Sequence, residues 1–194
     1  SCQGMQIWLG FGPRLVKGHL YIHALDVHKH LAPLISGMPT LGRVAVIDAG
    51  HGKDNKGTRS IFNKKYEKEY TLDWAMRLKP LLESKGWRVF ISLHFNAAAA
   101  KVSGLETYCI SPTGMPSHFT RGSPDLVSTK LPNNPWDASS FQLAARVHNQ
   151  LLLKCRMPDR GVRRVRFMSV IKGQKRPAIL VEGGYLSNPT ESRK

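Results

Sequence analysis

Residues 44–52, which read VAVIDAGHG, begin with a continuous apolar run and lead directly into a histidine. The same arrangement returns at residues 91–94, ISLH, and at residues 178–182, AILVE. Continuous apolar runs rich in branched side chains are typical of strands that are buried on both faces of a parallel sheet. We therefore expect buried strands at 44–47, 91–93 and 178–181, each followed closely by a titratable side chain.

Helical patterns at 67–84 and 139–154 separate these runs, and residues 104–110 form a fourth candidate strand. Strands that alternate with helices predict an α/β domain with a mostly parallel sheet flanked by helices. This catalytic domain is expected at residues 43–194, with a long surface excursion at 111–137. Residues 1–42 form a small N-terminal docking segment, with strands at 5–9 and 19–22, a helix at 26–34 capped by Asp26, and a linker at 37–42.

Composition limits the classes of function. The chain of 194 residues is 41% hydrophobic, which suits one folded domain, and no apolar run approaches the ~20 residues of a membrane-spanning helix. A net charge of +16 favours anionic partners, but the basic residues are not interleaved with aromatics as in nucleic-acid modules, so no nucleic acid is expected. Cys2, Cys109 and Cys155 form no CxxC pair, which argues against a disulfide framework or a cysteine zinc site.

Helical phase distinguishes two neighbouring glutamates. Trp74, Leu78 and Leu81 form the apolar stripe that should face the sheet. Glu67 lies within about 20° of Trp74 and Leu78, whereas Glu69 lies about 140° and 180° from them. Because a carboxylate on the buried face is costly unless it is paired or bound to a metal, Glu67 is the better candidate ligand.

The carboxyl ends of parallel strands meet at one edge of the sheet, where active sites of α/β proteins lie. His51, Glu67 and His94 would form a His2Glu zinc set with a fourth position for water, whose pKa the metal would lower to about 7. Glu182 would act as general base. A structural carboxylate paired with an arginine is the alternative for Glu182, and Asp48 could accept a hydrogen bond from a ligand histidine or cap a turn.

Several blocks of sequence, in order, resemble the zinc-dependent N-acetylmuramoyl-L-alanine amidases: VIDAGHG (46–52), EKEYTL (67–72), SLHFNA (92–97), GLETY (104–108), DRGV (159–162), and PAILVE (177–182) followed by LSN (186–188). The resemblance implies that His51, Glu67 and His94 bind zinc and that Glu182 is catalytic. It implies cleavage of the amide between N-acetylmuramic acid and L-alanine in peptidoglycan. It also implies a location in the cell envelope, periplasmic or exported, with an activator protein as a second candidate partner.

The sequence departs from that family in three places. The family's crossover is absent between Val89 and Ile91, so we expect residues to be missing between Phe90 and Ile91. The last helix of the family, which should follow Glu191, is absent as well, and the 111–137 excursion is longer than expected.

Two other functions compete with this reading. A zinc carboxypeptidase also uses a His2Glu site, but the expected HxxE spacing fails after His51, where Gly52, Lys53 and Asp54 follow. The other is a basic binding domain for wall polymer or nucleic acid that has lost its catalytic site. A predicted basic surface would assist binding to an anionic wall, and its members are Arg160, Arg163, Arg164, Arg166, Lys172, Lys175 and Arg176.

Overall fold

The computed structural model describes residues 4–37, 45–83, 89–120, 122 and 124–194. Its centre is a five-stranded sheet in the order β3-β4-β7-β5-β6. The strands are β3 (Ala45–Ala49), β4 (Val89–Asn96), β5 (Leu105–Ile110), β6 (Asp159–Val165) and β7 (Ala178–Tyr185). Neighbours are parallel except β5 and β7, which are antiparallel. The predicted α/β class with a mostly parallel sheet is confirmed.

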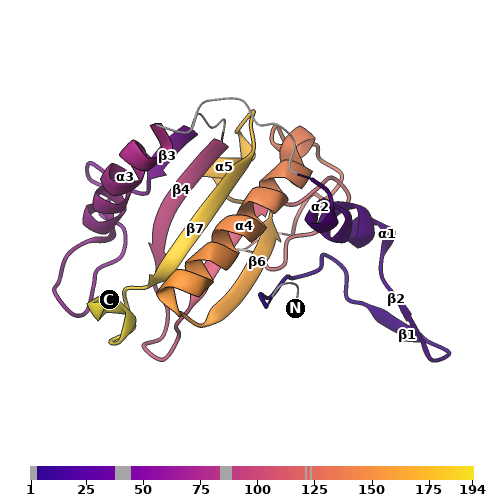
Figure 1. Cartoon of the computed structure of the whole chain (residues 1–194), viewed down its shortest axis with the longest axis horizontal. Helices are drawn as coiled ribbons and strands as arrows, with labels where there is room; N and C mark the ends of the chain where they lie inside the picture. The colour runs from indigo at the N-terminus through magenta and orange to yellow at the C-terminus, as the bar shows by residue number, and fades with distance from the viewer. Residues whose placement is uncertain (1–3, 38–44, 84–88, 121, 123) are drawn as a thin grey trace.

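Helices α3 (Glu67–Glu83) and α4 (Asp137–Cys155) cover one face of this sheet (Figure 1). Ile91, Leu93 and Val181 point to that face and join Phe141 of α4 in one hydrophobic core. A second core on the other face includes Leu180 and Ile171, the latter from α5 (Ser169–Lys172). Both faces are therefore covered, as the unbroken apolar runs require.

Strand β4 runs through the position of the expected gap. Val89–Asn96 forms one strand, in which Phe90 pairs with Val46 and Ile91 pairs with Ile47. The two apolar runs therefore continue each other in one extended segment, and the absence of a family crossover at this point stays a prediction. The connection that contains α3 supplies the crossover between parallel strands β3 and β4.

The N-terminal segment also differs from expectation. Residues 5–9 form no strand; Ile7 makes only an isolated bridge to Val162 at the free edge of β6. The hairpin lies further on, in β1 (Arg14–Val16) and β2 (His19–Tyr21). A helical run follows through α1 (Ala24–Asp26), a π-helical turn at Val27–Leu31 and α2 (Ala32–Ile35). The predicted linker falls mostly on residues 38–42, which lie outside the described residues.

Asp26 is not the N-cap of α1, because His23 holds that position and its Nδ1 atom accepts the N–H of Leu25. Asp26 is buried and accepts the backbone N–H groups of Gly10 and Phe11 at 2.7 and 3.0 Å. Its Oδ1 atom also lies 2.9 Å from Nδ1 of His30. The carboxylate therefore ties the chain before the hairpin to the helical run after it.

Arginine burial contradicts part of the predicted basic surface. Arg164 is fully buried, where it donates to Nε2 of His30 at 3.0 Å and to the carbonyl of Ile110 at 2.8 Å. Arg166 is buried too, and it donates to the carbonyls of Ser111 and Pro112. A guanidinium has five donors, so backbone carbonyls can satisfy it inside the protein. Of the predicted set, Lys172 and Lys175 are exposed.

The two ends of the 111–137 segment are packed, whereas most of its described middle, including Leu126, is exposed as expected. Met115, Asn133 and Asn134 are buried within it. The side chain of Asn133 donates to the carbonyls of Gln174 and Arg176, and that of Asn134 to Ser111. Side-chain amides that satisfy backbone groups allow an irregular segment to be buried. No described helix is long and apolar enough to cross a membrane.

Candidate active site

Four elements bring the predicted residues to one end of the sheet. His51 follows β3 by two residues, His94 lies in β4, and Glu67 is the first residue of α3. Glu182 lies in β7 as the register partner of His94, so the two side chains occupy the same face of the sheet. The carboxyl ends of β3, β4 and β7 and the start of α3 thus place all four side chains in one region.

The two histidines converge on one carboxylate oxygen. Nε2 of His51 and Nδ1 of His94 each lie 3.0 Å from Oε1 of Glu67. One potential ligand atom from each of the three residues lies within 4.8 Å of the others. Two ligands about 2.0–2.1 Å from a tetrahedral zinc are about 3.3 Å apart, so this spacing fits a metal of that size.

Helix phase correctly predicted which of the two glutamates is buried. Glu67 is 3% exposed, whereas Glu69 is exposed and accepts the backbone N–H of Tyr66 at the start of α3. Trp74 and Leu78 pack against the core as predicted. Leu81 does not and is largely exposed, because the α3 side chains that reach the core end at Leu78.

The Glu67 carboxylate is held on both oxygens. Phe95 N–H donates to Oε1 and Thr58 N–H donates to Oε2, each at 3.0 Å. Burial alone would raise the pKa of Glu67, but the hydrogen bonds from His94, Phe95 and Thr58 outweigh it and lower the pKa. The side chain is therefore an anion with a fixed orientation, as a metal ligand requires.

Glycines and an asparagine make room for the histidines and orient them. A Cβ atom on Gly50 would lie 2.5 Å from Nε2 of His94, and one on Gly57 would lie 2.6 Å from both His51 and Glu67. His51 has φ of 68°, in the left-handed region, and its Nδ1 lies 2.8 Å from Oδ1 of Asn55. This contact leaves Nε2 directed at Glu67.

The other titratable groups shape the charge around His94. Burial alone would lower the pKa of His94, but the hydrogen bond to Glu67 and the charges of Glu182, Glu67 and Asp48 raise it. Asp48 was expected to accept a hydrogen bond from a ligand histidine or to cap a turn, but its hydrogen bond is with a serine. Its Oδ2 accepts from Oγ of Ser92 at 2.6 Å, because Ser92 is its register partner on β4.

A buried acidic cluster beside Glu182 was not assigned a role from sequence. Glu106 on β5 is the register partner of Glu182 and accepts hydrogen bonds from Arg160, Tyr108 and Tyr185. Burial and the charge of Glu106 raise the pKa of Tyr185 to about 12, so its phenol stays protonated and donates. The block GLETY contained Glu106, but only the strand pairing shows that it faces the same region as Glu182.

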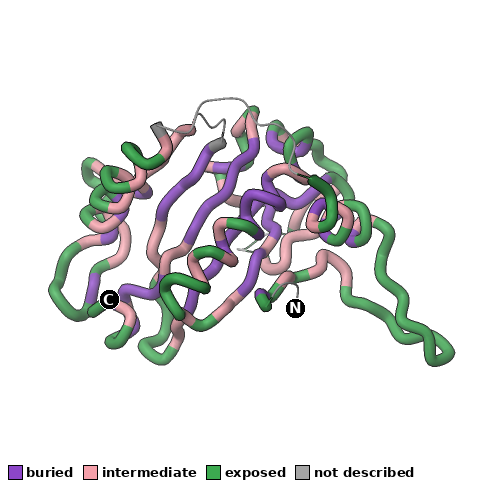
Figure 2. Tube along the Cα trace, viewed as in Figure 1, coloured by how far each residue is buried: buried purple, intermediate pink, exposed green. Residues whose placement is uncertain are grey.

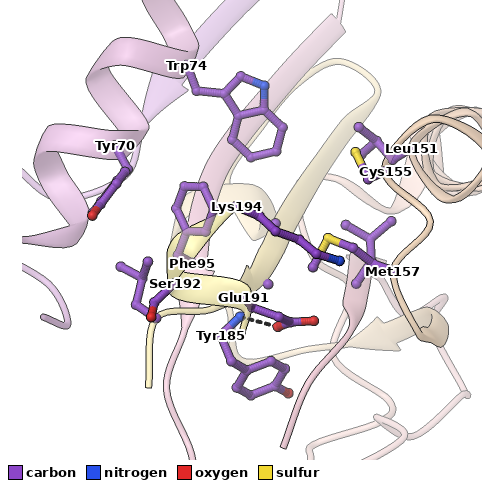
Figure 3. A pocket seen from close by; sticks show the side chains of 14 residues that line it. Tyr70, Trp74, Phe95, Leu151, Cys155, Met157, Tyr185, Glu191, Ser192 and Lys194 are labelled. Atoms are coloured by element: carbon purple, nitrogen blue, oxygen red, sulfur yellow. Dashed lines mark hydrogen bonds between the residues drawn. The ribbon is translucent and has the colours of Figure 1, made fainter. Parts of the chain in front are cut away.

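A cavity of about 480 Å³ lies on the opposite face of the sheet, between α3 and α4 (Figure 3). Trp74 and Phe95 line one side of it, and Leu151 and Met157 line another. Phe95 follows His94 directly in the strand and therefore projects to the other face. The cavity contains none of the four predicted site residues, so it is not the candidate active site.

Comparison with known proteins supports the same family as the sequence motifs. The family model Amidase_3, described as N-acetylmuramoyl-L-alanine amidase, matches residues 45–91 and 86–194. Both matches include residues 86–91, where β4 joins the two runs that had been expected to be separate strands.

Two similar proteins bear the names of amidases. The probable cell wall amidase LytH of Staphylococcus saprophyticus is 30% identical over 159 residues, which cover 79% of this chain and 51% of the relative. The N-acetylmuramoyl-L-alanine amidase LytC of Bacillus subtilis is 31% identical over 165 residues, covering 80% of this chain and 32% of the relative. The chain thus spans about half of the first relative and about a third of the second.

The fold also matches a solved catalytic domain. The catalytic domain of CwlV, an N-acetylmuramoyl-L-alanine amidase from Bacillus (Paenibacillus) polymyxa var. colistinus, is 25% identical with a TM-score of 0.58. The match covers 78% of this chain and 85% of that domain.

Proposed function

The chain belongs to the N-acetylmuramoyl-L-alanine amidase family, and on this premise we propose that it hydrolyses the amide between N-acetylmuramic acid and the L-alanine of the stem peptide in peptidoglycan. The observation that carries the proposal is the convergence of His51 and His94 on Glu67, with Glu182 beside His94 in the sheet register. Family membership favours this reaction over the carboxypeptidase alternative.

We assign His51, Glu67 and His94 as the ligands of a zinc ion. Two imidazoles and one carboxylate are a known catalytic zinc set, and their donor atoms already have a suitable spacing. The hydrogen bonds around these side chains also suit metal ligands, because Asn55 orients His51 and backbone N–H groups hold Glu67. Zinc would supply a Lewis acid for the scissile carbonyl and for the attacking water.

Glu182 is assigned as the general base. Its carboxylate takes a proton from the attacking water as the water oxygen bonds to the carbonyl carbon, and returns it to nitrogen as the C–N bond breaks. Its place beside His94 on the same face of the sheet supports this role. Glu106, held by Arg160 and two tyrosines, lies beside Glu182 as its register partner on β5.

Peptidoglycan is accordingly the proposed partner, and the cell envelope or the exterior of the cell is the proposed location. The net charge of +16 suits an anionic wall polymer. An activator protein stays a prediction.

Product analysis tests the reaction. Purified peptidoglycan is digested with the wild-type chain and with Glu182→Gln, and the soluble products are identified by mass. The proposal requires intact stem peptides with a free L-alanine amine from the wild type, and almost none from the variant. Peptides shortened at an internal bond, or released sugars with intact lactyl-peptide linkages, would contradict it. Zinc content measured on the same preparations separates a lost metal from a lost base.

A further inference from the structure

The hairpin arm, residues 13–22, is the most exposed regular structure in the described chain. Every residue of β1 and β2 is exposed, and the arm projects away from the sheet and its helices (Figures 1 and 2). Lys17 and Gly18 form its tip with φ of 49° and 79°. Two positive φ angles in a two-residue loop fit the tight turn typical of hairpins, so the arm is short.

The arm carries apolar side chains that nothing in the described chain covers. Leu15 pairs across the hairpin with Leu20, and they are 74% and 67% exposed. Val16 and Tyr21, on the other face, are about half exposed. An isolated two-stranded hairpin is marginally stable in water, and clustered exposed apolar side chains mark interaction sites. The arm therefore has the properties of a docking element.

Charge selects the class of partner. Residues 4–25 contain no aspartate or glutamate, and the arm adds Arg14 and Lys17 to its apolar side chains. A second copy of the chain would also carry a net charge of +16, so repulsion opposes pairing of two arms. The partner should be anionic and should also accept apolar side chains.

An anionic lipid bilayer meets both requirements. Its headgroups attract Arg and Lys, its interface accepts Leu and Tyr side chains, and it needs no complementary cleft on a projecting arm. A polar wall polymer would satisfy only the charges. We propose that the hairpin arm docks this protein on an anionic membrane surface.

The position of the arm suits such a contact. It lies outside residues 45–194, to which the family match is confined, and on the opposite side of the molecule from α3 and β3 (Figure 1). Membrane docking through the arm would leave the region around Glu67 accessible to substrate. The contact is independent of the proposed hydrolysis, since it uses none of the site residues.

Vesicle binding tests the inference. The full chain is sedimented with vesicles of phosphatidylglycerol and phosphatidylcholine in equal amounts, and with vesicles of phosphatidylcholine alone. Binding is expected with the first and not with the second. Leu15→Ser/Leu20→Ser should reduce the partition coefficient by at least roughly ten-fold. Arg14→Gln/Lys17→Gln should reduce it by roughly five-fold for each cation removed at low salt.

Matched controls exclude general effects. Leu126→Ser removes an equally exposed leucine from the 111–137 segment, and Lys172→Gln/Lys175→Gln removes two exposed cations elsewhere. These controls should bind nearly as well as the wild type, and all variants should keep its melting temperature. The proposal is overturned if the wild type does not bind the anionic vesicles, if the arm variants bind as tightly as their controls, or if sedimentation velocity shows a wild-type dimer that Leu15→Ser/Leu20→Ser dissolves.

Discussion

Gly50 provides a sharp test of how closely the backbone approaches the candidate metal ligands. In Gly50→Ala the new Cβ atom would lie 2.4 Å from Cε1 of His94 and 2.5 Å from the carbonyl oxygen of Leu93. That carbonyl cannot retreat easily, because it accepts the N–H of Gly50 at 2.9 Å. The carbonyl of Gly50 is in turn held by Oγ1 of Thr71 at 2.7 Å. The imidazole of His94 must therefore move.

Relief of this contact requires a displacement of about 1 Å, and an error of that size in a reacting site costs about 10²-fold in rate. Overpacking should also lower the free energy of unfolding by about 1–3 kcal/mol. Zinc per protein, hydrolysis rate and melting temperature are measured together, with Gly173→Ala as control, since its Cβ would meet nothing within 4 Å. Wild-type zinc content and rate in Gly50→Ala would refute the reasoning.

Three further predictions follow from the charges. Because the pKa of His94 is raised, protons compete with the metal for its imidazole at a higher pH than they would at an ordinary histidine of pKa about 6.5. Zinc affinity should therefore fall as the pH falls from 8 to 5. A constant affinity over this range would contradict the assignment of His94 as a ligand. Arg164→Met should lower the free energy of unfolding by about 1–3 kcal/mol in denaturant melts for each buried acceptor that it leaves unpaired, among them Nε2 of His30 and the carbonyl of Ile110. A change below about 1 kcal/mol would show that Arg164 is dispensable. Binding to purified wall should weaken as salt rises, because exposed charges are screened beyond ~8–10 Å; salt-independent binding would remove the electrostatic role.

The sequence predicts which side chains meet at the candidate site, because parallel strands expose their carboxyl ends at one edge of the sheet. This rule was enough to bring together His51, His94 and Glu182 from runs far apart in the sequence. The helical period placed Glu67 on the buried face of its helix and Glu69 on the exposed face, because side chains one turn apart share a face. Glu67 was therefore chosen as the candidate ligand. Both arguments use local geometry that the sequence encodes directly.

Features that depend on tertiary partners were not predictable. Strand β6 carries three arginines, which obscured the apolar pattern of a buried strand. Only the fold shows that His30 and backbone carbonyls accept the hydrogen bonds of Arg164 in the protein interior. Burial and the charge of Arg164 lower the pKa of His30 to about 2, so its neutral ring can accept from the guanidinium. The role of Asp26 was missed for the same reason, since its partners Gly10 and Phe11 lie in an irregular segment.

The most direct test of the central claim compares zinc content and wall-hydrolysis rate in three glutamate variants. Glu67→Ala should lose both zinc and activity, because only two histidine ligands are left. Glu182→Ala should keep zinc and fold but lose about 10²–10⁴-fold in rate, as expected for a missing general base. Glu69→Ala should keep its zinc and nearly its full rate, since its side chain is exposed. Loss of zinc from Glu69→Ala but not from Glu67→Ala, or a near-normal rate in Glu182→Ala, would contradict the account.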